Sequence, residues 1–131
     1  RRRMFNLGNL LWHSDSSFKA TPAKYSMLHA RILPPEGGNT EFADMRAAWD
    51  ALPEDKRALV ENLVCDHSLI YSRAALGFDA FTDEERSAFE PVPQRLVRRH
   101  PGSGRRSLYL SAHIGTIHGW HRPEAMMLIR E

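Results

Sequence analysis

Several stretches of the chain alternate apolar and polar positions in the way that β-strands do. Residues 24–33 are rich in Tyr, Ile and Leu and stop at two prolines. Residues 94–100 and 107–112 flank a Pro-Gly-Ser-Gly sequence that is typical of a hairpin turn. Residues 4–15 are expected to form a loop with a short strand, and 40–43 and 67–71 to be extended. The pattern therefore predicts strands toward both ends of the chain.

Between these stretches the apolar spacing changes to that of helices. Four segments are expected to be helical. The first covers residues 45–52 and is capped by Asp44, and the second begins at Pro53 and has an apolar stripe at 59–64. The third begins with a capping box of Thr82 and Glu85, and the fourth covers 124–130 after Pro123. The order of strands, helices and strands predicts an α+β fold with a helical insertion at about residues 44–90.

Composition adds that this is an ordinary globular sequence. The 131 residues are 42% apolar and 26% charged, which fits a single domain. No stretch of about 18 uncharged apolar residues is present, so we expect no membrane association. A signal peptide is not expected, because Asn and Gly interrupt the apolar run near the start. The single cysteine, Cys65, excludes an internal disulfide and favours a cytoplasmic location.

The charge is unevenly distributed along the chain. The net charge is +2, but residues 36–90 carry a net −8 and the remainder +10. Five arginines cluster between Arg95 and Arg106, with Tyr109 near them in sequence. No recognition helix, zinc finger or aromatic sheet motif accompanies this cluster, so we expect no nucleic-acid binding and favour a solvated or anion-attracting face.

One spacing among the seven histidines suggests chemistry. His13 and Asp15 are two residues apart, and in a strand such side chains point to the same face. With one distant histidine, they would complete the facial triad of non-haem Fe(II) oxygenases. With seven histidines, this spacing alone does not establish a site. Residues 113–121 lack the His-Glu-x-x-His pattern of metalloproteases.

The sequence around His13 and Asp15 resembles the iron-binding segment of the taurine and 2,4-dichlorophenoxyacetate dioxygenase family. The similarity extends in order through most of the chain, over residues 11–18, 22–26, 37–45, 67–73 and 100–110. The amino-acid sequences of these segments are most similar to those of the phenoxyacetate branch of the family. The resemblance implies an incomplete double-stranded β-helix (jelly-roll) oxygenase fold.

The family resemblance also implies an activity and its cofactors. The enzyme would use Fe(II), 2-oxoglutarate and O₂ to hydroxylate an aryloxyalkanoate such as 2,4-dichlorophenoxyacetate. The products would be a phenol, glyoxylate, succinate and CO₂, as in the degradation of aromatic herbicides. The expected partner is a small carboxylic acid, and homo-oligomerisation of the full-length protein stays open.

Specific positions acquire roles through the same resemblance. His13 and Asp15 would be two of the three iron ligands, and the Thr40 hydroxyl would hydrogen-bond a carboxylate of 2-oxoglutarate. Asn9, Ser17 and Tyr109 lie in segments that approach the substrate pocket in relatives. Read without the family, Thr40 is a β-branched strand residue, and the other three fit turn, cap or core positions.

The chain departs from the family pattern in two places. The family has a distal histidine after an Asn-Arg segment and an arginine about ten residues beyond that histidine. Neither residue has a match here, and His118 or His121 with Arg130 only approximates the spacing. The sequence also opens with Arg1 rather than Met. We therefore expect residues 1–131 to be an internal, central fragment of one oxygenase domain, inactive and marginally stable alone.

Other functions remain open at this point. Within the family, the substrate could be a sulfonate or another small organic acid. Outside it, the chain could be a non-catalytic module that binds anions through the arginines between Arg95 and Arg106. A cupin-like metal protein of different chemistry would need a full set of histidine ligands within the chain.

Overall fold

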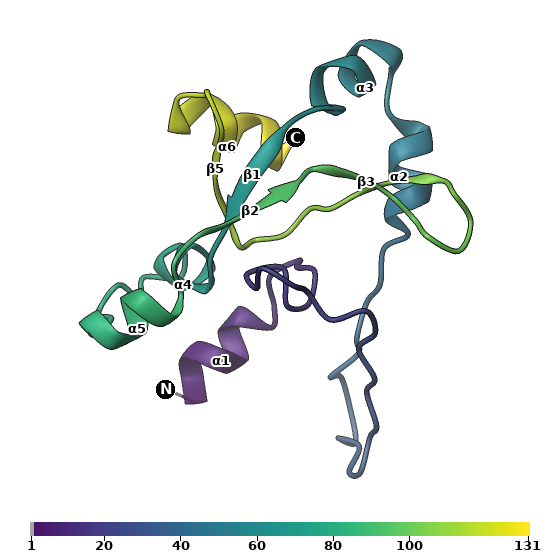
Figure 1. Ribbon diagram of the computed structural model, residues 1–131. Helices are drawn as coiled ribbons and strands as arrows, with labels where there is room; N and C mark the ends of the chain where they lie inside the picture. Colours follow the sequence, from purple (N-terminus) through teal and green to yellow (C-terminus); the bar gives the residue numbers. More distant parts are fainter. Residues whose placement is uncertain (1) are drawn as a thin grey trace.

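Two small antiparallel sheets form the centre of the protein, with short helices around them (Figure 1). This computed structural model describes residues 2–131. The helices are α1 (Arg2–Gly8), α2 (Met45–Ala51), α3 (Glu54–Val60), α4 (Leu69–Ala74), α5 (Asp83–Ala88) and α6 (Arg122–Arg130). The strands are β1 (Val64–His67), β2 (Val92–Arg95), β3 (Val97–Arg99), β4 (Arg106–Leu108) and β5 (Ile114–Ile117). The predicted α+β class is confirmed.

The first sheet places β1 between β2 and β5, and the second is the β3–β4 hairpin. The predicted hairpin is confirmed, with Val97 opposite Leu108. The predicted strand over 94–100 is interrupted at Leu96, whose backbone N–H donates to the Leu63 carbonyl while its own carbonyl accepts from Tyr109. Leu96 therefore links the two sheets, and the single predicted strand becomes β2 and β3.

The hydrophobic core lies between these sheets and the helices α2 and α6. Its buried members are Trp49, Val60, Cys65, Leu96, Val97, Leu108, Ile114, Ile117 and Ala125. Helix α2 packs on β4, and α6 packs on β5. Burial of these side chains is the main source of stability for residues 44–131, which we call the body.

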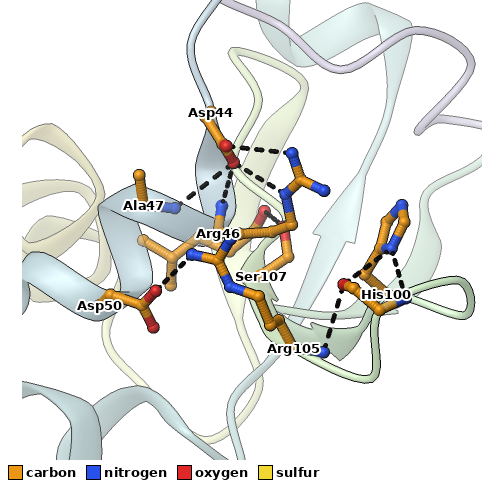
Figure 2. Close-up of polar contacts among 9 residues, drawn as sticks. Asp44, Arg46, Ala47, Asp50, His100, Arg105 and Ser107 are labelled. Carbon is orange, nitrogen blue, oxygen red and sulfur yellow. Dashed lines mark hydrogen bonds and ion pairs between the residues drawn. The ribbon is translucent and has the colours of Figure 1, made fainter.

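Local capping signals place several of the helix starts. The Asp44 carboxylate accepts the backbone N–H of Arg46 at 2.9 Å and that of Ala47, as predicted for the start of α2 (Figure 2). The capping box of Thr82 and Glu85 is present at α5. Pro53 was expected at the first helical position, but it lies at the N-cap, so α3 begins one residue later, at Glu54. Helix α6 carries its proline in the first turn.

Helix α1 corrects the prediction of a loop and short strand for residues 4–15. Gly8, one of the residues that interrupt the apolar run, ends α1 at a point where the backbone meets Arg73 of α4. A Cβ atom added at Gly8 would lie 2.0 Å from a guanidinium nitrogen of Arg73, so the glycine permits this close approach. The contact between α1 and α4 stabilises the helix, and this contact cannot be seen in the local sequence.

The expectation of an extended segment over 67–71 is also wrong beyond Ser68. The Ser68 hydroxyl accepts the Ile70 N–H at 3.1 Å and donates to the Phe89 carbonyl at 2.6 Å. This N-cap starts α4 directly after β1. The Leu-Ile-Tyr sequence has strand propensity, but the cap and burial of Leu69 favour the helix.

The predicted strands over 24–33 and 40–43 do not form. Both lie in an irregular segment, residues 9–43, which extends away from the body as a long excursion (Figure 1). We call it the long loop. Strand-like side chains alone do not make a strand, because each strand needs a neighbour for its backbone hydrogen bonds.

The predicted helical insertion over 44–90 is helix-rich but also contains β1, the central strand of the first sheet. Within residues 2–131, no helix combines the length and apolar character needed to cross a membrane.

Candidate metal centre

His13 and Asp15 converge at the start of the long loop. The Nε2 atom of His13 lies 3.2 Å from Oδ1 of Asp15, and both side chains reach solvent. The backbone there is not the strand that the spacing assumed: residues 15–18 form a turn. Ser16, with φ of 59°, adopts the left-handed conformation and turns the chain directly after Asp15. The turn therefore brings together the two side chains that the sequence singled out.

A hydrogen bond defines the tautomer of His13. Its Nδ1 atom lies 2.6 Å from the Leu11 carbonyl oxygen, which can only accept, so Nδ1 carries the proton. In the neutral ring, Nε2 then presents a lone pair toward the Asp15 carboxylate. Two acceptors 3.2 Å apart require a proton or a cation near them. A carbonyl on the far ring nitrogen is the usual arrangement for a metal-bound histidine, so this pair fits a divalent metal ion.

The pair could supply two ligands to such a site. Among the residues that the structure describes, no group of three or more His, Cys, Asp or Glu side chains could hold a metal ion. Neither His118 nor His121 completes the site: His118 instead pairs with Asp66 at 2.8 Å, and His121 caps α6.

Polar contacts attach the turn to residues 110–112 of the body. Three hydrogen bonds do this: the Ala112 N–H to the Trp12 carbonyl at 2.9 Å, the Ser14 hydroxyl to the Leu110 carbonyl at 2.8 Å, and the Ser17 hydroxyl to Ser111 Oγ at 3.3 Å. Ser17, a candidate substrate contact, is fully buried in this junction. Its hydroxyl therefore holds the turn in place in this structure.

Gln94 of β2 also connects the turn to the body. Its side-chain amide donates to the Ser17 carbonyl at 3.0 Å and to the Lys19 carbonyl at 2.9 Å. Gln94 is 6% exposed, so its amide donates to these carbonyls rather than to water. A side chain of the sheet thereby fixes the chain directly after Asp15. The sequence predicted a strand at this position but offered no signal for the contact.

His113 is a neighbour of the pair that the sequence did not single out. Its buried ring lies 6.0 Å from the His13 ring, between centroids, and edge-on to Phe18 at 5.0 Å. Its Nδ1 atom lies 2.9 Å from the Ser72 hydroxyl. Burial, with the charges of His13 and Arg73, lowers the pKa of His113 to about 4, so the ring is neutral at pH 7. Nothing in the linear sequence separates it from the other histidines.

The other candidate residues lie apart from the pair. Thr40 is exposed near the end of the long loop, and Asn9 is exposed in the turn after α1. Tyr109 follows β4, with its ring stacked on His67 at 5.6 Å between centroids. Burial raises the pKa of Tyr109, an effect that the nearby Arg98 charge partly opposes. Of these candidates, Ser17 therefore lies in the same turn as Asp15, and Thr40 lies apart from it.

Comparison with known proteins places this chain in a family. The family profile described as "Taurine catabolism dioxygenase TauD, TfdA family" matches residues 2–131. The chain is 48% identical over 126 residues to an alpha-ketoglutarate-dependent 2,4-dichlorophenoxyacetate dioxygenase of Burkholderia sp. (strain RASC), covering 96% of this chain and 42% of that protein. It is 43% identical over 130 residues to an (S)-phenoxypropionate/alpha-ketoglutarate-dioxygenase of Sphingobium herbicidovorans, covering 95% and 45%.

Solved structures show the same relationship. The crystal structure of AAD-2 with Mn(II) and N-oxalylglycine superposes with a TM-score of 0.95 at 60% identity, covering 99% of this chain and 47% of that one. A taurine dioxygenase from Burkholderia xenovorans gives 0.74 at 27% identity, covering 94% and 40%. The chain thus spans less than half the length of these relatives. With a profile match over residues 2–131, the chain belongs to the TauD/TfdA family of dioxygenases.

Proposed function

We propose that the protein acts as an Fe(II)- and 2-oxoglutarate-dependent dioxygenase on an aryloxyalkanoate such as 2,4-dichlorophenoxyacetate. The observation that carries the proposal is the His13–Asp15 pair, with Nδ1–H of His13 held by the Leu11 carbonyl and Nε2 facing the carboxylate. Relatives at 43–48% identity are named for activity on phenoxy acids with alpha-ketoglutarate. The crystallised relative AAD-2 holds Mn(II) and N-oxalylglycine.

In this proposal each residue has a defined task. His13 and Asp15 would hold the iron, which supplies O₂ activation with 2-oxoglutarate as co-substrate. The Leu11 carbonyl keeps His13 in the tautomer that presents Nε2, and the turn at Ser16 orients Asp15 toward it. Gln94 and the junction with residues 110–112 keep this turn in register with the sheet. The neutral His113 ring supplies a buried wall next to His13 without adding charge.

The remaining assignments rest on the family. Thr40 is proposed to hydrogen-bond a carboxylate of 2-oxoglutarate, and Asn9, Ser17 and Tyr109 to approach the substrate. Residues 1–131 are proposed as the central part of one double-stranded β-helix domain, with the helix-rich segment at about 44–90. A cytoplasmic location is also proposed, and the single cysteine, Cys65, buried and unpaired, supports it. A sulfonate or sulfate ester substrate is the alternative, since a sulfate ester dioxygenase of Pseudomonas putida is 33% identical.

Metal binding by the chain tests the central claim. Mn(II) serves as the probe, and the free ion is followed by electron paramagnetic resonance as protein is added. His13→Ala should weaken Mn(II) binding by about tenfold or more, because one of two ligands is lost. His29→Ala is the matched control, since His29 is exposed in the long loop. Equal Mn(II) binding by the His13→Ala variant and the unaltered chain would refute the assignment.

Turnover tests the activity and the substrate class. Full-length protein carrying this sequence should convert 2-oxoglutarate to succinate when given Fe(II), O₂ and 2,4-dichlorophenoxyacetate, with release of the phenol. His13→Ala should abolish succinate formation. Faster turnover with an alkyl sulfate or sulfonate than with the aryloxy acid would favour the alternative substrate. Residues 1–131 alone should turn over negligibly, because only two ligands are present in the described chain.

A further inference from the structure

A second polar site lies beside the hairpin, apart from the metal ligands. An open pocket of about 640 Å³ is formed where β2 and the β3–β4 hairpin meet the end of α3. Four arginines line it, Arg95, Arg98, Arg99 and Arg106, together with Glu61 and Gln94. The volume is in the range of small-molecule sites in proteins. The pocket contains neither His13 nor Asp15.

The positive charge in this pocket exceeds the negative charge. Arg106 forms an ion pair with Glu61. Arg98 donates to the neutral amide of Gln94, and Arg99 donates to the Gly104 carbonyl at 3.1 Å. Within residues 2–131, neither these two arginines nor Arg95 forms an ion pair with a carboxylate. About three positive charges in one pocket are therefore uncompensated.

The neighbouring Arg105 shows that an arginine of this hairpin can pair with a carboxylate of the protein. It lies on the same hairpin and forms an ion pair with Asp50 of α2 (Figure 2). By contrast, the register of the hairpin places Arg99 directly opposite Arg106. Like charges at facing strand positions are destabilising. Glu61 offsets the charge of Arg106 but not that of Arg99, so an anion beside Arg99 would relieve the remaining repulsion.

Arg98 is held in place before any ligand arrives. Its guanidinium carbon lies 3.7 Å from the centre of the Tyr109 ring, within cation–π distance. It also donates to Gln94, which is 6% exposed and is itself fixed by the Ser17 and Lys19 carbonyls. A planar guanidinium carries five N–H donors, more than one amide oxygen accepts. A stacked, anchored arginine loses little entropy when it binds an oxyanion.

We propose that the pocket where Arg95, Arg98 and Arg99 meet beside the buried Gln94 binds a small polyvalent oxyanion, separately from the metal centre. Guanidinium groups pair with phosphate and carboxylate oxygens through two parallel hydrogen bonds. Several uncompensated charges favour a ligand with more than one anionic group over a monovalent ion. Phosphate esters and polycarboxylates share this chemistry, and the experiment separates the two sources.

Isothermal titration calorimetry of the chain with inorganic pyrophosphate and with citrate tests the proposal, at an ionic strength held constant with NaCl. Saturable binding of one of them is expected, and the stronger ligand identifies the source. Arg98→Gln and Arg95→Gln should each weaken it by about tenfold, since each removes a charged hydrogen-bond donor. Arg31→Gln, which makes the same charge change in the exposed long loop, should change the affinity by less than about twofold.

Three results would overturn the site. The first is the absence of saturable binding by either anion at millimolar concentrations. The second is an equal loss in Arg31→Gln and Arg98→Gln, which would indicate attraction by net charge alone. The third is binding of a single-stranded oligonucleotide but of neither small anion, which would indicate a nucleic-acid surface. Arg95 is exposed, so Arg95→Gln retains the fold and tests the site even where Arg98→Gln does not.

Discussion

The body and the long loop differ in what holds them in place. The body buries an apolar core between two sheets and two helices. The long loop buries only Ser17, and it exposes large apolar side chains that include Met27 at 93% and Ile32 at 90%. Yet the proposed metal ligands lie in the loop. The comparison shows that this site depends on polar contacts to the body rather than on burial of its own segment.

Loops that carry binding residues on a rigid scaffold are common. Here the scaffold is the sheet edge at Gln94 and residues 110–112, and all of its contacts with the loop fall within residues 12–19. Beyond Lys19 the loop has no comparable attachment among the described residues. The part that positions His13 and Asp15 is therefore the attached part, and the predictions below test this division.

Removal of core volume should produce the largest effect. Ile117→Ala leaves a cavity beside β1, because Ile117 is 2% exposed, and it should lower the free energy of unfolding by about 2–5 kcal/mol. Ile32→Ala in the long loop should change it by less than about 0.5 kcal/mol. Urea unfolding followed by tryptophan fluorescence measures both. Similar losses in the two variants would mean that the loop is packed in solution.

Acid should destabilise the body through His67. The ring is fully buried, and burial, with the charges of His113 and Arg98, lowers its pKa from 6.5 to about 4. The unfolded state therefore binds a proton first as the pH falls, so stability is full above about pH 6.5 and decreases toward pH 4, by about 3 kcal/mol.

His67→Phe keeps a ring against Tyr109 and removes this titration. Its free energy of unfolding should depend less steeply on pH between 6.5 and 4 than that of the unaltered chain. His29→Phe in the long loop should retain the original slope. An unchanged slope in His67→Phe would show that its protonation is not linked to folding.

Loss of the link between body and loop should have an intermediate effect. Gln94→Ala removes the donors to the Ser17 and Lys19 carbonyls and should cost about 1–3 kcal/mol. Mn(II) affinity should fall as well, because the turn at Ser16 loses its attachment to the sheet. Asn62→Ala, an exposed position in the same arginine pocket, is the control. Unchanged Mn(II) affinity in Gln94→Ala would show that the turn holds its shape independently.

The smallest effect is expected at the periphery of the body. Thr82→Ala removes the N-cap of α5, a helix with no buried residue, and should cost about 1 kcal/mol. Thr82→Ser keeps the hydroxyl and should cost less. Amide hydrogen exchange in α5 measures the local effect, and no change in protection there would contradict the importance of the cap.

Prediction from the sequence succeeded where the signal was local. Asp44, the capping box of Thr82, the hairpin turn and the final helix depend on neighbours within a few residues. It failed at α1 and α4, whose stability involves Arg73 and Phe89 far along the chain. It also failed over 24–33, since strand propensity is realised only beside another strand. The convergence of His13 and Asp15 was predicted correctly, but from a strand that is in fact a turn.

The sequence by itself determined the family, the pairing of His13 with Asp15 and the capped helix starts, because each is encoded in short stretches of residues. Only the tertiary structure decided the rest. It placed Gln94 under the turn, the neutral His113 beside His13, and in one pocket three arginines that form no ion pair with a carboxylate of residues 2–131. These features join residues that are distant along the chain, and long-range packing and hydrogen bonding, rather than local propensity, bring them together.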